Sequence, residues 1–115
     1  MNMMSYGLEV YRLQSRLCRF LSHPERLRIT EVLGTGEKSV SELVELTGLP
    51  QPTVSRHLGL LAELGVLEAE RRGRRVYYKL KYPEVLEASR ILRSVLLKIL
   101  EEKGRLTVLV SAEMD

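Results

Sequence analysis

Hydrogen-bonding side chains are clustered in segment 51–57 of the sequence. The segment contains Gln51, Thr53, Ser55, Arg56 and His57. A glutamine amide can pair with two atoms of adenine, an arginine guanidinium can pair with two atoms of guanine, and a threonine methyl can contact the thymine methyl. Each good pair contributes about 1–3 kcal/mol of discrimination between bases. These residue types indicate recognition of DNA bases, provided that one helix presents them on its exposed face.

A local excess of positive charge extends over residues 51–81. This segment has seven basic and three acidic residues, whereas the net charge of all 115 residues is +3. A basic region on an otherwise nearly neutral chain is typical of a surface that binds a polyanion. The arginines around Gly73 are expected to contact phosphates or to enter the minor groove, and they are Arg72, Arg74 and Arg75.

Each of these residues also has a purely structural interpretation. Thr53 and Ser55 could be ordinary polar residues of a first helical turn, and Arg56 could pair with Glu63 or a neighbouring acidic residue. The arginines beside Gly73 could form the solvated tip of a hairpin. His57 lies at the flank of an apolar helix face, so a structural role and a contact with DNA are equally open.

The sequence contains no recognisable catalytic, metal-binding or cofactor-binding constellation. No nucleophile is paired with a base at a known spacing, and there is no glycine-rich phosphate loop. The single cysteine, Cys18, cannot form an internal disulfide or a multi-thiolate zinc site. No apolar run is long enough for a membrane span, and no secretory signal is apparent. We expect no enzyme activity, no metal or cofactor, no membrane contact and a reducing, cytoplasmic setting.

Cys18 itself has two interpretations. It lies on a helix expected at a subunit interface, where a thiol could pair across a two-fold axis or be oxidised. The interpretation that we favour is a small, buried apolar residue.

Helical periodicity and capping signals predict four helices in the first half of the chain. They span residues 5–21, 24–33, 40–47 and 51–65. Ser39 and Glu42 form a capping-box pattern before the third helix, and Gly48 is its expected left-handed terminator. The third helix should direct Leu43, Val44 and Leu46 inward, and the fourth should bury Val54, Leu58 and Leu61.

The period of the pattern changes at residue 66. Two short strands, 66–72 and 74–81, are predicted around Gly73, and they form a basic hairpin. A helix over 83–103 follows, with apolar residues on nearly every side between Ile91 and Leu100. One neighbouring helix cannot cover so much apolar surface, so a second subunit is expected to cover part of it.

These elements predict one domain over residues 1–115 that is mainly α-helical with a two-stranded β-wing. Residues 40–65 form the helix-turn-helix and residues 66–81 form the wing. For the tail 105–115, periodicity leaves an added strand, a helical extension and a disordered end open. The fold is a winged helix-turn-helix of about five helices. Helices 5–21 and 83–103 are expected to build a homodimer. In this arrangement the second helix of the pair enters the major groove and the first crosses the DNA backbone.

Four runs of the sequence closely resemble the ArsR/SmtB family of bacterial and archaeal repressors. They are the segments 21–29 (LSHPERLRI), 41–43 (SEL), 49–58 (LPQPTVSRHL) and 73–78 (GRRVYY). The resemblance covers roughly residues 5–103. It implies a homodimer formed by the first and last helices, a recognition helix that begins near Gln51, and an affinity for operator DNA that an inducer weakens.

The sequence also departs from this family at its metal-sensing positions. Many members bind soft metals through a Cys-Val-Cys segment, where this chain has Ser39-Val40-Ser41, and hydroxyls are poor ligands for soft metals. Other members use histidines on the last helix, whereas residues 83–103 contain none. Pro50 and Pro52 replace common hydroxyl residues, which removes a helix cap worth about 1 kcal/mol. Metal sensing is therefore not expected.

The predicted function is a dimeric, sequence-specific transcriptional repressor that binds double-stranded operator DNA. Its inducer is unidentified, and a regulator without an inducer is a variant of this prediction. The alternative is a winged-helix module that binds another protein through its last helix and has weak or no affinity for DNA. The polar and basic face of the helix at 51–65 favours the first prediction.

Overall fold

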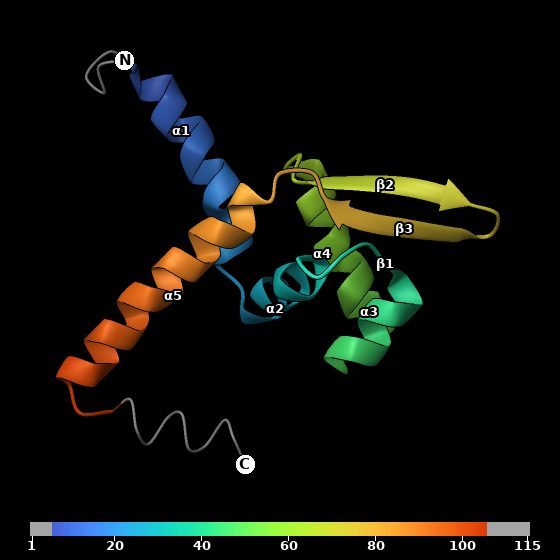
Figure 1. Ribbon diagram of the computed structural model, residues 1–115. Coiled ribbons are helices and arrows are strands. Elements are labelled where there is room, and N and C mark those ends of the chain that lie inside the picture. The colour runs from blue at the N-terminus through green and yellow to red at the C-terminus, as the bar shows by residue number, and fades with distance from the viewer. Residues whose placement is uncertain (1–5, 106–115) are drawn as a thin grey trace. The chain divides into compact units, whose positions relative to one another are not determined.

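The computed structural model describes residues 6–105, which form two compact units that divide after Pro83. The first unit contains α1 (Leu8–Leu17), η2 (Cys18–Leu21), α2 (Pro24–Leu33), β1 (Lys38–Ser39), α3 (Val40–Thr47), α4 (Gln51–Glu63), β2 (Leu67–Arg72) and β3 (Arg75–Leu80). The second contains α5 (Glu84–Glu102) (Figure 1). The five predicted helices are confirmed, and the end of the first one is the 3-10 helix η2. The predicted tail lies outside the described residues from residue 106 onward.

Local capping sets the ends of α2 and α3. The Nδ1 atom of His23 accepts a hydrogen bond from the Glu25 N–H at 3.2 Å, at the start of α2. The Oγ of Ser39 accepts from the Glu42 N–H, and the Glu42 carboxylate accepts from the Ser39 N–H at 3.0 Å. This pair is the predicted capping box. Gly48 then adopts a φ of +73°, the left-handed conformation that ends α3.

Helices α2, α3 and α4 surround the core of the first unit. Its most deeply buried side chains include Ile29, Leu43, Val54, Leu58 and Leu61. The prediction that Leu46 points inward is wrong, because its side chain is 53% exposed. Thr47 takes the inner position instead, and its hydroxyl donates to the Leu43 carbonyl at 2.6 Å. A residue four positions after Leu43 lies nearer to the same helix face than one three positions after it.

The wing is an antiparallel sheet with the strand order β1-β3-β2. In the hairpin, Leu67 lies opposite Leu80 and Arg72 lies opposite Arg75. The prediction of a two-stranded wing is incomplete, since β1 pairs with β3 through Lys38 and Ser39. A strand of two residues is too short to show an alternating pattern. Figure 1 shows the β2–β3 hairpin starting near one end of α4, with its tip projecting beyond α3.

Two helices expose large apolar side chains. Helix α1 has no buried residue, and its exposed side chains include Leu8, Val10, Tyr11, Leu13 and Leu17. Those of α5 include Ile91, Leu92, Val95, Leu96, Leu97 and Ile99. Apolar surface of this kind on a small protein marks a place where a partner binds. Across residues 6–105, none of the helices combines the length and apolar character that a membrane span requires.

Candidate nucleic-acid interface

The exposed face of α4 carries most of the side chains predicted to contact bases. Gln51, Ser55 and Arg56 are exposed, and Thr53 is partly exposed. Val54, Leu58 and Leu61 hold the opposite face of the helix in the core. The proposed ion pair between Arg56 and Glu63 is not formed, and within residues 6–105 Arg56 has no ion-pair partner. The Arg56 guanidinium is therefore available to a ligand outside the chain.

The N-terminus of α4 has no side-chain cap. Pro50 is the N-cap residue, and it provides no side-chain cap to the first turn. Backbone N–H groups at a helix N-terminus attract anions when side chains do not satisfy them. The first turn of α4 thus combines polar side chains with a weakly positive backbone.

His57 lies inside the first unit. Its side chain is 3% exposed, and its Nδ1 atom lies 3.3 Å from Nη1 of Arg26 on α2. A ring in this position cannot reach a DNA groove while the fold is intact. Of the two roles left open for His57, the structure supports the structural one, and the prediction of a DNA contact is wrong.

A cluster of four residues, His23, Glu25, Arg26 and His57, joins α4 to the N-terminal end of α2. We call it the Arg26–His57 cluster. Arg26 is itself buried, and it donates from Nη2 to the Arg19 carbonyl at 2.6 Å and to Oγ of Ser22 at 3.3 Å. The His23 and His57 rings are in contact, with their centroids 4.5 Å apart and their planes tilted by 56°. These contacts fix the position of the recognition helix relative to α2.

Burial determines the charge of His57. It lowers the pKa of the imidazole, and the nearby His23 and Arg26 lower it further, while Glu25 acts in the opposite direction. Burial, together with the charge of Arg19, also lowers the pKa of Arg26, which remains protonated. A guanidinium can only donate, so Nδ1 of His57 accepts and the ring proton is on Nε2, 3.7 Å from the Glu25 carboxylate.

Among the described residues, His23, Glu25 and His57 are the group that could hold a metal ion, with ligand atoms within 4.8 Å of one another. Their hydrogen bonds oppose this role. A metal on Nε2 of either ring would require a proton on Nδ1. That proton would face the Arg26 guanidinium in His57 and the Glu25 N–H in His23. The chemistry of the donor set therefore fits a hydrogen-bonded support better than a metal site.

Arg72, one of the predicted DNA contacts, is bound within the protein. Its guanidinium contacts both carboxylate oxygens of Glu37, each at 2.7 Å, and one carboxylate oxygen of Glu70 at 2.9 Å. It also lies over the Tyr77 ring, 4.6 Å from the centroid. The Arg72 hydrogen bond lowers the pKa of Glu37. Arg72 thus anchors the wing to the segment before β1, and its charge is already compensated.

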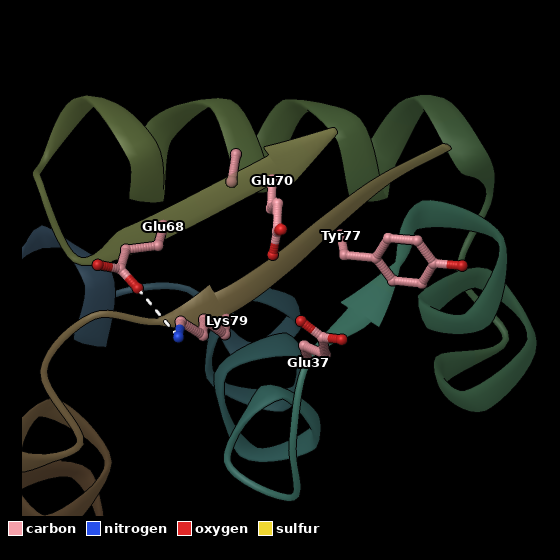
Figure 2. Close-up of a pocket in the computed structure, with 6 residues that line it drawn as sticks. Glu37, Glu68, Glu70, Tyr77 and Lys79 are labelled. Atoms are coloured by element: carbon pink, nitrogen blue, oxygen red, sulfur yellow. Dashed lines mark ion pairs between the residues drawn. The ribbon is translucent and has the colours of Figure 1, made fainter. Parts of the chain in front are cut away.

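One face of the hairpin carries a pocket with three carboxylates. A pocket of about 260 Å³ is lined by Glu37, Glu68, Ala69, Glu70, Tyr77 and Lys79. Figure 2 shows Lys79 turned toward Glu68, with which it forms an ion pair at 3.3 Å. Glu37 and Glu70 both pair with Arg72, so the carboxylates of this pocket are compensated, and Arg75 lies opposite Arg72 on the same face of the hairpin.

Three arginines of the hairpin remain available to phosphates. Arg74 lies in the turn, and Arg71 and Arg75 lie on the two strands beside it. All three side chains are exposed, and none forms an ion pair with another described residue. The predictions for Arg74 and Arg75 are consistent with this geometry, and Arg71 joins them as a neighbour that the sequence analysis did not select.

Two further residues considered in the sequence analysis are Ser39 and Cys18. Ser39 is buried and its hydroxyl caps α3, so this residue has a folding role. Cys18 is a free thiol at the start of η2 and is exposed. The favoured interpretation of Cys18 as a buried residue is therefore wrong for the single chain.

Sequence reasoning did not find Arg26 and Glu37. Arg26 acts on His57, which is 31 positions away, and Glu37 acts on Arg72, which is 35 positions away. No local periodicity connects such pairs. The one available signal for Arg26 was a charged residue directly beside the apolar positions of a predicted helix.

Comparison with known proteins places this geometry among DNA-binding regulators. A family model described as a helix-turn-helix domain matches residues 21–70. The HTH-type transcriptional regulator Rv0081 of Mycobacterium tuberculosis is 34% identical over 95 residues, which cover 82% of this chain and 83% of the relative. Its crystal structure gives a TM-score of 0.74 at 32% identity and covers 85% of this chain and 99% of that chain.

Two further similarities support this placement. The crystal structure of the transcriptional repressor BigR from Xylella fastidiosa has a TM-score of 0.68 at 33% identity, covering 76% of this chain and 89% of that chain. The homodimeric winged helix-turn-helix domain Mb0332 of Mycobacterium bovis, described as a possible ArsR-family regulator, has a TM-score of 0.70 at 26% identity. This match covers 84% of this chain and 89% of that chain.

The fold and the exposed face of α4 define a winged helix-turn-helix transcriptional regulator. The similarity in sequence over most of both chains identifies the family more narrowly. This chain belongs to the ArsR/SmtB family.

Proposed function

We propose that this chain is a homodimeric repressor that binds operator DNA through α4 and the tip of the wing. The observation that carries the proposal is the exposed Arg56, which has no ion-pair partner within residues 6–105 and stands among short polar side chains on α4. Several relatives are named as repressors, and one neighbouring structure is a homodimer. The proposed role is regulatory and not enzymatic. A protein with this role works where the DNA is, so we propose a cytoplasmic location.

The positions of the exposed side chains assign different DNA contacts to α4 and to the wing. Gln51, Thr53, Ser55 and Arg56 contact base edges, because they share the exposed side of one helix. Arg71, Arg74 and Arg75 contact phosphates, which position the protein but carry no sequence information. His57 and Arg72 support these elements from within the protein.

The proposal is tested by fluorescence anisotropy with a duplex selected by the wild-type chain from a randomised pool. Three wing arginines from each of two protomers neutralise about six phosphates, so the slope of log K against log salt is expected to be about −5. Arg56→Ala should lower the affinity for the selected duplex about tenfold and relax the preference at one base pair. Lys79→Gln/Glu68→Gln is the control, because it removes both charges of one ion pair and leaves the net charge unchanged. Affinity indifferent to salt and to sequence contradicts the proposal.

A further inference from the structure

Gly59 is the one described glycine that lies inside a helix. It occupies the middle of the 13-residue helix α4 and is exposed. After proline, glycine is the least favourable residue in a helix interior, because it loses the most backbone freedom on folding. A glycine at this position therefore weakens the element on which the proposed interface is built.

Neither backbone conformation nor packing within the chain explains Gly59. Gly36, Gly48, Gly65, Gly73 and Gly104 have positive φ angles, which favour glycine, whereas Gly59 does not belong to this set. A Cβ atom added at Gly59 would meet no heavy atom within 4 Å. An alanine would fit this position of the described structure without any rearrangement.

The position of Gly59 on the helix suggests what the missing side chain permits. At about 100° per residue, positions 52, 56, 59 and 63 fall on one side of α4, and Gly59 lies near the middle of that side. Arg56 precedes it by one turn on this side, and Ser55 lies on its flank. Gly59 thus leaves bare backbone in the centre of the surface proposed to face DNA.

We propose that Gly59 is a specificity-determining residue, at which the backbone of α4 approaches the DNA closely. This inference rests on the proposed function. A side chain here would hold the helix axis away from the groove, and the short side chains of Thr53 and Ser55 would then lose contact with base edges. The long side chain of Arg56 tolerates such a displacement better, so short-range contacts suffer first.

The test compares Gly59→Ala and Gly59→Leu with the wild-type chain by thermal unfolding and by anisotropy. Both variants should melt a few degrees higher, because alanine and leucine are better helix formers. Gly59→Ala should bind the selected duplex about tenfold more weakly, which is the loss of one good base contact, and Gly59→Leu should lose more. A random duplex of equal length should lose less affinity, since its contacts are mainly to phosphates.

Ala62→Gly is the matched control, because Ala62 is exposed on the same helix nearer to its C-terminal end. It should lower the melting temperature and leave the affinity unchanged, which separates helix stability from DNA contact. If Gly59→Ala and Gly59→Leu bind the selected duplex as tightly as the wild type, the inference on Gly59 is overturned and the proposed function stands. If the wild-type chain selects no duplex, both are overturned.

Discussion

The buried imidazole of His57 is a titratable group on the recognition helix that faces away from the DNA. Its neighbours on α2 are Arg26, Glu25 and His23, and Arg56 adds positive charge from α4 itself. His23, Arg26 and Arg56 disfavour a positive charge on the His57 ring, and Glu25 favours it. The neutral form of His57 therefore belongs to the folded state.

Folding stability should consequently fall when the pH drops below the ordinary pKa of histidine, about 6.5. The folded state lowers the pKa of His57, so in this range the unfolded chain binds a proton that the folded chain does not. The contribution of His57 is complete above pH 6.5 and is lost progressively as the pH falls through the lowered value. Thermal unfolding at pH 7.5 and pH 5.5 measures this loss.

His57→Gln separates this effect from that of other groups. Its amide oxygen can still accept from Arg26 but does not titrate. The variant is expected to melt lower at neutral pH, yet to lose less between pH 7.5 and pH 5.5 than the wild type. Glu37 and Glu42, whose pKa values are lowered by their hydrogen bonds, lose their contributions at lower pH in both proteins. An equal loss in the wild type and the variant would argue against this role of His57.

At the scale of elements, the helices of the first unit follow from local chemistry. The bounds of α2 were predicted because proline fits the first helical turn and a glycine turn follows the last. The capping box of α3 and the positive φ of Gly48 are equally local. These signals depend on residues at most four positions apart, so the sequence displays them directly.

The roles of individual interface residues depend on distant partners, and the sequence could not predict them. Arg72 was selected because it stands among arginines beside a turn, but the third strand, β1, brings Glu37 next to it. His57 was ambiguous because its helix position borders the core, and Arg26 decided its role. The roles assigned to Arg72 and His57 therefore changed once the tertiary contacts were known, whereas the helices and strands themselves were predicted well.

The wing offers a direct test of this distinction between free and compensated arginines. Arg74→Ala should reduce the salt slope of DNA binding by about 0.9 for each phosphate contact that is lost. The paired change Arg72→Ala/Glu37→Gln removes an arginine and its carboxylate charge together, so it should leave the slope unchanged. Anisotropy titrations over a salt series measure both slopes. Equal reductions in the two variants would show that Arg72 contacts DNA as well.

At the scale of the whole molecule, the exposed apolar side chains of α1 and α5 support the proposed homodimer. A helix such as α5, with six large apolar side chains among its exposed residues, is rarely left in contact with water. Regulators with a helix-turn-helix bind paired half-sites as two-fold symmetric dimers. A subunit interface that includes α1 and α5 would explain why these helices expose apolar side chains. It would also bring two wings to one DNA duplex.

Leu96→Asp tests this assembly. The leucine side chain is 50% exposed in the middle of the apolar part of α5. An aspartate at that position would bury an unpaired charge in a dimer, which costs far more than the contacts that it replaces. We expect the variant to sediment as a monomer at micromolar concentration. Its affinity for the selected duplex should fall at least about a hundredfold, because a second half-site no longer binds with the first.

Lys98→Gln is the control for this change, since it alters the net charge by the same single unit. Position 98 lies about 200° around the helix from Leu96. The variant should remain a dimer and bind DNA nearly as the wild type does. A Leu96→Asp protein that stays dimeric would place the subunit contact elsewhere on the chain. A wild-type chain that sediments as a monomer but orders α5 with another protein would instead support the interaction-module alternative.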